Sequence, residues 1–157
     1  PLVADILIGM NRLGQKTGKG WYRYEAGDRK PIPDADVNGI IERTATSAGI
    51  QRGNKSEPEI LERCIFALIN EGARALAEGV ATRAADIDVI YLMGYGFPAF
   101  RGGPMFYADQ IGLDTVVAGL GKFAKSGNAR DWQPAKLLSQ LAVSGSSFAA
   151  WAEARKA

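Results

Sequence analysis

The sequence predicts an all-α fold, a bundle of short packed helices. Apolar residues recur at helical spacing along most of the chain, and the strongest such pattern covers residues 56–79. Serine, proline and glycine stand where helices would start and stop, and the connections between the segments are short. No segment of strand length alternates apolar and polar residues convincingly at period two. Together these observations predict helices packed on helices.

The first expected helix lies in residues 2–14, where apolar positions follow helical spacing. It has no convincing N-cap, which is typical of a chain cut inside or just before an element. Gly14 is the expected stop, because glycine readily takes the left-handed backbone that ends helices. The expected apolar face contains Leu2, Ile6, Ile8 and Met10.

Residues 14–24, GQKTGKGWYRY, suggest at first a phosphate-binding loop. A P-loop, however, has four residues between its glycines and a hydroxyl residue after its lysine. Here three residues separate Gly14 from Gly18, and Gly20 stands where the hydroxyl would be. We therefore expect a glycine turn, with no phosphate cradle, that packs the aromatic side chains of Trp21, Tyr22 and Tyr24.

A polar connector with two prolines follows in residues 25–36, and it is the expected domain boundary. A modest helix is expected in residues 35–49, followed by a linker in residues 50–55. The predicted organisation is a first segment (1–30), a connector with a short helix (31–55) and a main helical segment (56–157).

The strongest helix signal begins at Ser56, which forms a capping-box pattern with Glu59. Glu59 also lies one turn before Arg63, in the order that favours an ion pair. The expected core face contains Leu61, Cys64, Ile65, Leu68, Ile69, Ala73 and Leu76. Cys64 is therefore expected to be a core residue and not a nucleophile.

Further helices are expected along the rest of the chain. They are a short helix in residues 85–94 opened by Asp86, a helix in residues 104–112 with Pro104 at its first position, and helices in residues 113–127 and 133–145.

Residues 94–109, GYGFPAFRGGPMFYAD, connect two of these helices. Their glycines free the backbone and their prolines stiffen it, so we expect a rigid corner. Arg101 is the only cation of the segment and could meet either an anionic ligand or a carboxylate of a neighbouring helix. The aromatic residues expected to form a packed cluster here are Phe97, Phe100, Phe106 and Tyr107.

The composition excludes several kinds of catalytic site. The sequence has no histidine and one cysteine, which rules out a Ser-His-Asp triad, a histidine-ligated metal and a multi-cysteine zinc site. Glu71 and Asp86 are most simply explained by surface ion pairs and helix caps, and neither they nor Asp88 and Asp109 form an evident acid–base pair. We expect no catalytic residue and no metal site in this chain.

The charge and hydropathy patterns bear on partners and location. Nineteen basic residues against seventeen acidic residues give a formal charge of +2, which does not predict nucleic-acid binding. No apolar run approaches the roughly 20 residues that span a bilayer, so no membrane span is expected. The sequence ends in ARKA, which is not a peroxisomal tag, and a single cysteine suits a reducing compartment. These features predict a cytoplasmic protein.

Two long strings, residues 12–27 (RLGQKTGKGWYRYEAG) and 70–109 (NEGARALAEGVATRAADIDVIYLMGYGFPAFRGGPMFYAD), closely resemble the C-terminal part of 3-hydroxyacyl-CoA dehydrogenases. The resemblance is nearest to the multifunctional fatty-acid β-oxidation enzymes, which join an enoyl-CoA hydratase module to the dehydrogenase. In that family a Rossmann domain precedes two related helical domains. The resemblance implies that residues 1–30 are the tail of the first helical copy and that residues 56–157 are the second copy.

The resemblance also implies where the chemistry takes place. The family's NAD-binding loop and its catalytic histidine and glutamate belong to the Rossmann domain, so NAD is expected in the parent enzyme and no cofactor in this chain. Where the first copy has an asparagine followed by arginine, this copy has Glu62 and Arg63, which implies a structural partner without its own catalytic centre. The residues that the resemblance implies along the acyl path are Met93, Tyr95, Phe97 and Phe100.

Three functional hypotheses follow. The leading one is a C-terminal fragment of an NAD-dependent 3-hydroxyacyl-CoA dehydrogenase that is inactive alone. It would contact the Rossmann and first helical domains of its parent and the acyl-CoA substrate. A second hypothesis is an autonomous helical module that forms a homodimer. A third is a phosphate- or nucleic-acid-binding module that uses Lys16, Lys19 and Arg101.

Overall fold

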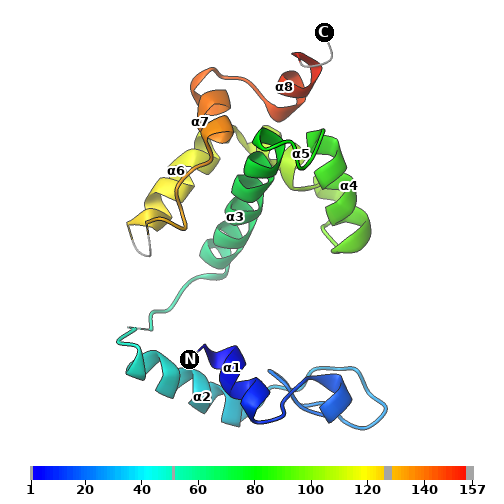
Figure 1. Cartoon of the computed structure of the whole chain (residues 1–157), viewed down its shortest axis with the longest axis vertical. Coiled ribbons are helices and arrows are strands. Elements are labelled where there is room, and N and C mark those ends of the chain that lie inside the picture. Colours follow the sequence, from blue (N-terminus) through cyan, green and yellow to red (C-terminus); the bar gives the residue numbers. More distant parts are fainter. Residues whose placement is uncertain (1, 51, 126–128, 155–157) are drawn as a thin grey trace. The chain divides into compact units, whose positions relative to one another are not determined.

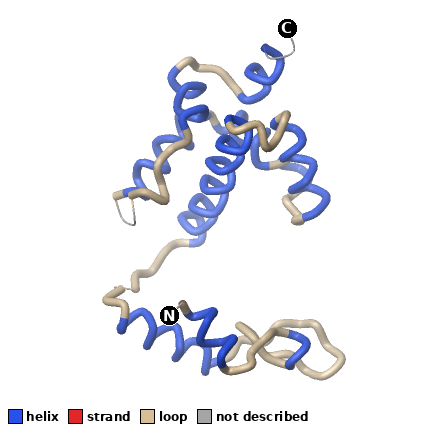
Figure 2. Tube along the Cα trace, viewed as in Figure 1, coloured by secondary structure: helices blue, strands red, loops and turns tan. Residues whose placement is uncertain are grey.

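A computed structural model of the chain describes residues 2–50, 52–125 and 129–154. These residues form helices joined by loops and turns, and none of them belongs to a named strand (Figures 1 and 2). The β-type pairings among the described residues are isolated bridges between positions 14 and 32. The all-α prediction is confirmed.

The chain divides into two compact units, unit 1 (residues 1–54) and unit 2 (residues 55–157). This boundary lies at the C-terminal end of the predicted linker, and the helix predicted in residues 35–49 belongs to unit 1. The connector of residues 25–36, expected to be the boundary, lies inside unit 1, so that prediction is wrong.

Unit 1 contains α1 (Val3–Gly9), the 3-10 turn η1 (Gln15–Thr17) and α2 (Ala35–Ser47). Its core consists of Leu7, Val37 and Ile40, with Val3, Ile6 and Ile41 packed against them. The predicted face of the first helix is mostly wrong, because Leu2, Ile8 and Met10 are exposed. The helix stops earlier than expected, since the backbone of Asn11 has a φ of 55°. Leu7 is the residue of α1 that is buried against α2. We had expected the face formed by residues 2, 6 and 10 to be buried instead.

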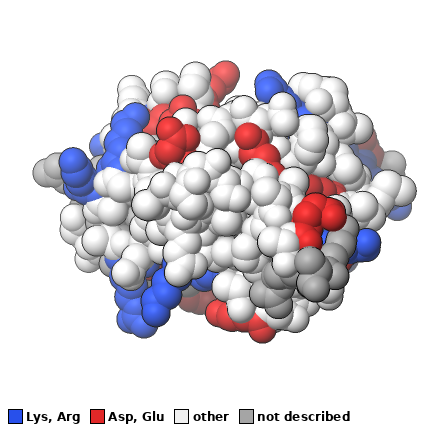
Figure 3. Space-filling view, turned by 90° about the horizontal axis from the view of Figure 1, so that it is seen from above, with Lys and Arg blue, Asp and Glu red and all other residues white. Residues whose placement is uncertain are grey.

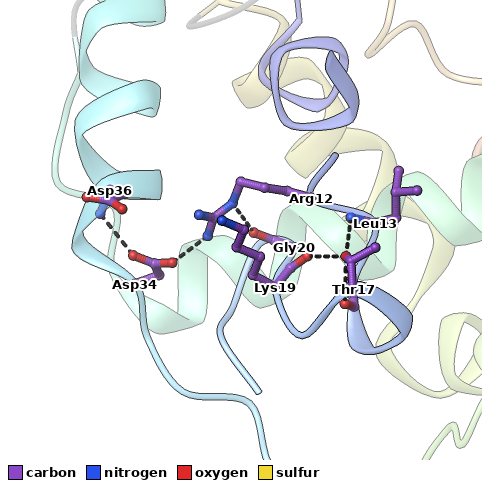
Figure 4. Close-up of polar contacts among 8 residues, drawn as sticks. Arg12, Leu13, Thr17, Lys19, Gly20, Asp34 and Asp36 are labelled. Atoms are coloured by element: carbon purple, nitrogen blue, oxygen red, sulfur yellow. Dashed lines mark hydrogen bonds and ion pairs between the residues drawn. The ribbon is translucent and has the colours of Figure 1, made fainter. Parts of the chain in front are cut away.

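A buried ion pair attaches the connector to the rest of unit 1 (Figure 4). The guanidinium of Arg12 pairs with the carboxylate of Asp34, and its Nε donates a hydrogen bond to the carbonyl of Gly20 at 3.0 Å. The other carboxylate oxygen of Asp34 accepts from the amide of Asp36 at 3.1 Å and so caps α2. One arginine thus links the glycine turn to the start of α2, which explains why residues 25–36 do not separate two domains.

This pair predicts a pH dependence for unit 1. The Arg12 guanidinium holds the pKa of the Asp34 carboxyl below its ordinary value. A lowered native-state pKa stabilises the fold above the unfolded pKa, and this contribution is lost as pH falls through the native pKa, in the range below about 4. Unit 1 should therefore lose stability in this range, as measured by amide hydrogen exchange at Arg23 and Ile32, which are paired to each other.

Two variants test the assignment of this effect to Asp34. Asp34→Asn should already be less stable near neutral pH, because it leaves the buried Arg12 without a counter-ion, and its stability should fall less on acidification. Asp36→Asn, which changes an exposed carboxylate nearby, should keep the native acid response. An unchanged acid response in Asp34→Asn would contradict the assignment.

Unit 2 is built around the long helix α3 (Figure 1). Its helical elements are α3 (Glu57–Ala77), α4 (Ala84–Gly94), the 3-10 turn η2 (Ala99–Arg101), α5 (Pro104–Ile111), α6 (Leu113–Ala124), α7 (Lys136–Val143) and α8 (Phe148–Ala154). Helices α4, α5, α6 and α7 all pack against α3, and α5 also contacts α8. The sequence predicted each of these helices except α8, and Pro104 is the first residue of α5 as expected.

The start of α3 follows the sequence signals closely. The hydroxyl of Ser56 accepts a hydrogen bond from the amide of Glu59 at 3.3 Å. Arg63 donates two hydrogen bonds to the Glu59 carboxylate, at 2.9 and 3.1 Å, so the predicted ion pair is confirmed. Arg63 also holds the pKa of Glu59 below its ordinary value, with a further contribution from Lys55.

The buried face of α3 differs from the predicted one. It consists of Phe66, Ile69, Asn70, Gly72, Ala73 and Leu76. Leu61 is 63% exposed, and Cys64 is exposed as well, so the prediction that both belong to the core is wrong. Arg63 and Phe66, on either side of Cys64, both lie against Phe123 of α6, so Cys64 is exposed because its side chain leaves α3 in a different direction from theirs.

Asp86 does not open α4 as predicted, because the helix begins after Arg83 and Asp86 is its third residue. The Asp86 carboxylate accepts from the amide of Arg83 at 3.1 Å and pairs with the side chain of the same arginine. It therefore still stabilises the first turn, but by reaching back to the residue before the helix.

Two other aspartates hold neighbouring helices together. Asp88, in α4, accepts hydrogen bonds from the amides of Met105 at 2.7 Å and Phe106 at 3.1 Å, in the first turn of α5. Asp109, in α5, accepts from the amides of Phe148 at 2.8 Å and Ala149 at 3.1 Å, at the start of α8. Because each carboxylate satisfies amides that have no partner within their own helix, each fixes one helix end against another.

Two glycines of α6 provide a matched test of packing in unit 2. A Cβ on Gly119 would overlap the ring of Phe66, whereas a Cβ on Gly121 would meet nothing within 4 Å. Gly119→Ala should lower the free energy of unfolding by about 1–3 kcal/mol through overpacking. Gly121→Ala should raise it by about 0.5–1 kcal/mol, because alanine favours the helix. Equal effects in urea unfolding would contradict this packing.

Candidate functional site

An apolar groove of about 380 Å³ lies in unit 2. One side is formed by α3, another by the loop that contains η2, and the remainder by α5 and the start of α6. Its apolar lining includes Leu61, Ile65, Phe66, Phe97, Phe100 and Ile111. Glu62, Arg101 and Thr115 supply polar groups. A mostly apolar groove of this size with a few polar groups is typical of a small-molecule site.

The loop between α4 and α5 shapes this groove. Gly96 and Gly102 both have left-handed backbones, with φ of 69° and 73°, and they enclose the segment that contributes aromatic residues. The amide of Phe97 donates to the carbonyl of Tyr91 at 3.0 Å, which attaches the segment to α4. The predicted corner between the two helices is therefore present, and its rigidity stays a prediction.

The packed aromatic cluster predicted for this corner is not present. Phe100 is 83% exposed and Phe106 is about half exposed. Phe100 lies in the short turn η2, none of whose residues is buried. A phenylalanine this exposed, next to an apolar groove, presents surface that a ligand or another protein segment could cover.

The structure brings together only part of the predicted acyl-path set. Phe97 and Phe100 line the groove. Met93 is 84% exposed and Tyr95 is 74% exposed, and neither lines the groove. The ring of Tyr95 lies against that of Tyr91, with 5.1 Å between their centroids. A role for these side chains along the acyl path stays a prediction.

Arg101 lies beside the aromatic rings of the groove. Its guanidinium carbon is 5.2 Å from the ring centroids of both Phe100 and Tyr107, at cation–π distance. No ion pair involves Arg101 among the described residues, so the structure does not show the neighbouring carboxylate that the sequence allowed as its partner. Glu62, which the family resemblance aligns with an asparagine of the first copy, lies on the α3 side of the same groove.

The described residues offer no evident acid–base machinery near this groove. Burial raises the pKa of the Asp88 carboxyl, while hydrogen bonds from the amides of Met105 and Phe106 oppose the increase and nearby Asp109 adds to it. Asp88 nevertheless serves as a helix cap and does not line the groove. Within residues 2–50, 52–125 and 129–154, no group of three or more metal-binding side chains could hold a metal ion.

The glycine segment of unit 1 forms a turn, as predicted (Figure 4). The amides of Gly14, Thr17 and Gly18 donate to carbonyls within the turn, at 3.0–3.1 Å. A P-loop instead presents its amides to phosphate. The packing expected of the aromatic residues is partial, because Trp21 and Tyr22 are about half exposed.

The charge distribution and the helix lengths bear on two other possible roles, nucleic-acid binding and membrane insertion. On the face seen in Figure 3, acidic and basic side chains both lie around a broad uncharged area. Across the described ranges, no helix combines the length and the apolarity required to cross a bilayer.

Comparison with known proteins identifies a family for most of unit 2. Residues 60–148 match the family model described as "3-hydroxyacyl-CoA dehydrogenase, C-terminal domain". This range begins near the start of α3 and ends at the first residue of α8, so it includes the complete groove.

Curated relatives extend the similarity to almost the whole chain. The Peroxisomal bifunctional enzyme is 43% identical over 92% of this chain in Danio rerio and 42% identical over 91% in Homo sapiens. The Peroxisomal fatty acid beta-oxidation multifunctional protein of Arabidopsis thaliana is 34% identical over 91%. The chain spans 20% of the length of each of these relatives. Because they are named as peroxisomal, the prediction of a cytoplasmic protein is wrong.

Proposed function

The chain belongs to the 3-hydroxyacyl-CoA dehydrogenase family, and from this we propose that it is the C-terminal helical part of an NAD-dependent enzyme of fatty-acid β-oxidation. The single observation that carries the proposal is the family match over residues 60–148. The parent would oxidise the 3-hydroxyl of an acyl-CoA thioester and transfer a hydride to NAD. The names of the relatives support a peroxisomal location for the parent.

The residues of this chain do not fit the role of an NAD site. A dinucleotide fingerprint requires a glycine-rich turn between a strand and a helix. The glycine turn of unit 1 follows a helix, and its amides are bonded to its own carbonyls. The sequence also has no histidine that could take the hydroxyl proton. We therefore assign the redox chemistry to the part of the parent that lies outside this chain.

The proposed role of the chain is to support the dehydrogenase and to contact the acyl group. The apolar groove supports the second part of this role, because Phe97 and Phe100 offer aromatic surface to a hydrocarbon chain. Exposed apolar residues of α4 support the first part. Val89, Ile90 and Met93 are all more than half exposed, and we propose that other domains of the parent cover them.

Phe100→Ala in the complete parent enzyme tests the acyl contact. The substitution should raise KM for a long-chain 3-hydroxyacyl-CoA by roughly 3- to 10-fold through lost apolar contact, with kcat nearly unchanged. The KM for a four-carbon substrate should change little, because a short acyl chain does not reach the groove. Val143→Ala, which changes a 90% exposed residue of α7, is the control. Equal effects on both substrates would contradict the acyl contact.

A further inference from the structure

The groove of unit 2 combines a long apolar wall with one cation at its edge. The wall is formed by side chains of α3, α5 and the η2 loop, and Phe100 remains 83% exposed beside it. An apolar chain lying along this wall would remove the Phe100 ring from water, which is favourable by the hydrophobic effect. The groove therefore suits a ligand that has an apolar chain.

Arg101 favours a ligand whose other end carries a negative charge. Its guanidinium lies over the rings of Phe100 and Tyr107 and has no carboxylate partner in the described part of the chain. Both rings lie at cation–π distance from the guanidinium, and Arg101 is itself exposed, so its charge is accessible to an anion from solvent. The planar guanidinium matches a carboxylate or phosphate through paired N–H groups.

We propose that this groove binds an amphiphile, a molecule with an apolar chain along the groove and an anionic end, carboxylate or phosphate, at Arg101. This proposal goes beyond the acyl contact proposed above, because it assigns a defined end group to a defined residue and requires only this chain. Thr115 and Tyr107 line the same groove and offer hydroxyl groups to the ligand.

The negative charge of Glu62 should repel the anionic end of such a ligand, and Glu62 therefore provides an internal control. Glu62 belongs to the same lining as Arg101, on the α3 side. No ion pair joins the two residues, so Glu62 does not neutralise Arg101 by direct contact. The two charges should therefore act on an anionic end group in opposite directions, whereas neither should affect a neutral ligand with the same chain.

The size of the groove favours a small amphiphile over a protein segment. A volume of about 380 Å³ lies within the range of small-molecule sites. A stable protein interface would instead require roughly 1,000 Å² or more of matched surface. Charge complementarity at a single cation is also better suited to one anionic group than to an extended partner.

Binding of three probes to the complete 157-residue chain tests the proposal. The probes are dodecanoate, dodecyl phosphate and dodecanol, each measured by titration calorimetry below its aggregation concentration. At least one anionic probe should bind roughly 3- to 10-fold more tightly than dodecanol, an advantage that decreases at high salt. The comparison of the two anions shows whether a carboxylate or a phosphate is preferred.

Matched variants test whether Arg101 causes the preference for anionic probes. Arg101→Gln should remove the advantage of the anionic probes and leave dodecanol binding unchanged. Glu62→Gln should strengthen the binding of the anions by about two- to threefold without changing that of dodecanol. Arg83→Gln removes the same formal charge from the residue that precedes α4, away from the groove lining, and should behave like the native chain. Circular dichroism confirms that each variant is folded.

Several outcomes would overturn the proposal: no binding of any probe, equal affinity for all three probes, or an anionic advantage that survives in Arg101→Gln. None of these would affect NADH formation by the intact parent, so a failure here is distinguishable from a failure of the proposed dehydrogenase function.

Discussion

Asn70→Ala is expected to lower the free energy of unfolding of unit 2 by about 2–4 kcal/mol. Asn70 lies in the core face of α3 and is only 2% exposed. Its Oδ1 accepts a hydrogen bond from the amide of Ala135 at 2.7 Å, and its Nδ2 donates to the carbonyl of Gln133 at 3.0 Å. Alanine would leave a cavity and a buried amide without a partner at the start of α7. Urea unfolding followed by circular dichroism measures the change.

The neighbouring residue provides the control for this prediction. Glu71 is exposed and forms a surface ion pair with Arg74, so Glu71→Ala should change stability by less than about 0.5 kcal/mol. Arg74 also donates to the carbonyl of Gln133, so that carbonyl keeps a partner in Asn70→Ala. Faster hydrogen exchange should therefore appear at the amide of Ala135. Similar losses for the two variants would show that the Asn70 contacts are not important for stability.

Gly103→Ala is the second substitution for which we expect a large effect. Gly103 precedes α5 with φ 101° and ψ 167°, a region that is almost restricted to glycine. A Cβ there would also overlap the side chain of Asp88, which caps α5. Backbone strain and a disturbed cap together should cost about 3 kcal/mol or more. The free energy of unfolding in urea is again the measurement.

Gly94→Ala is the control for Gly103→Ala. Gly94 is the last residue of α4, and a Cβ there would meet nothing within 4 Å. This substitution should leave unit 2 as stable as before or raise its stability by up to about 1 kcal/mol. If Gly103→Ala were tolerated equally well, the tight approach of α4 to the start of α5 would be wrong.

Local signals in the sequence were sufficient to predict most helices. The Ser56 cap and Pro104 mark the starts of α3 and α5, because both act within one turn of the residue that carries the signal. Which face becomes buried was harder to predict, since it depends on neighbours. Cys64 and Phe66 lie on the same apolar helix, yet only Phe66 has other helices packed over it.

Contacts between distant residues could not be predicted. The caps formed by Asp88 and Asp109 join residues 17 and 39 positions apart, and no spacing rule links such positions. The same limit applies to the groove. Family resemblance indicated Phe97 and Phe100, but only the fold shows that Glu62 of α3 lines the same groove as Arg101 of η2.

We propose that the chemistry of the parent enzyme lies outside this chain, which has no histidine to take a proton and, among its described residues, no fitting site for NAD. The deciding experiment measures NADH formation from a 3-hydroxyacyl-CoA in parallel for the isolated chain and the intact parent. We expect turnover by the intact parent and none by the chain at the same concentration. NADH formation by the chain alone would show that the chain itself is catalytic, and its absence with the intact parent would rule out the proposed dehydrogenase function.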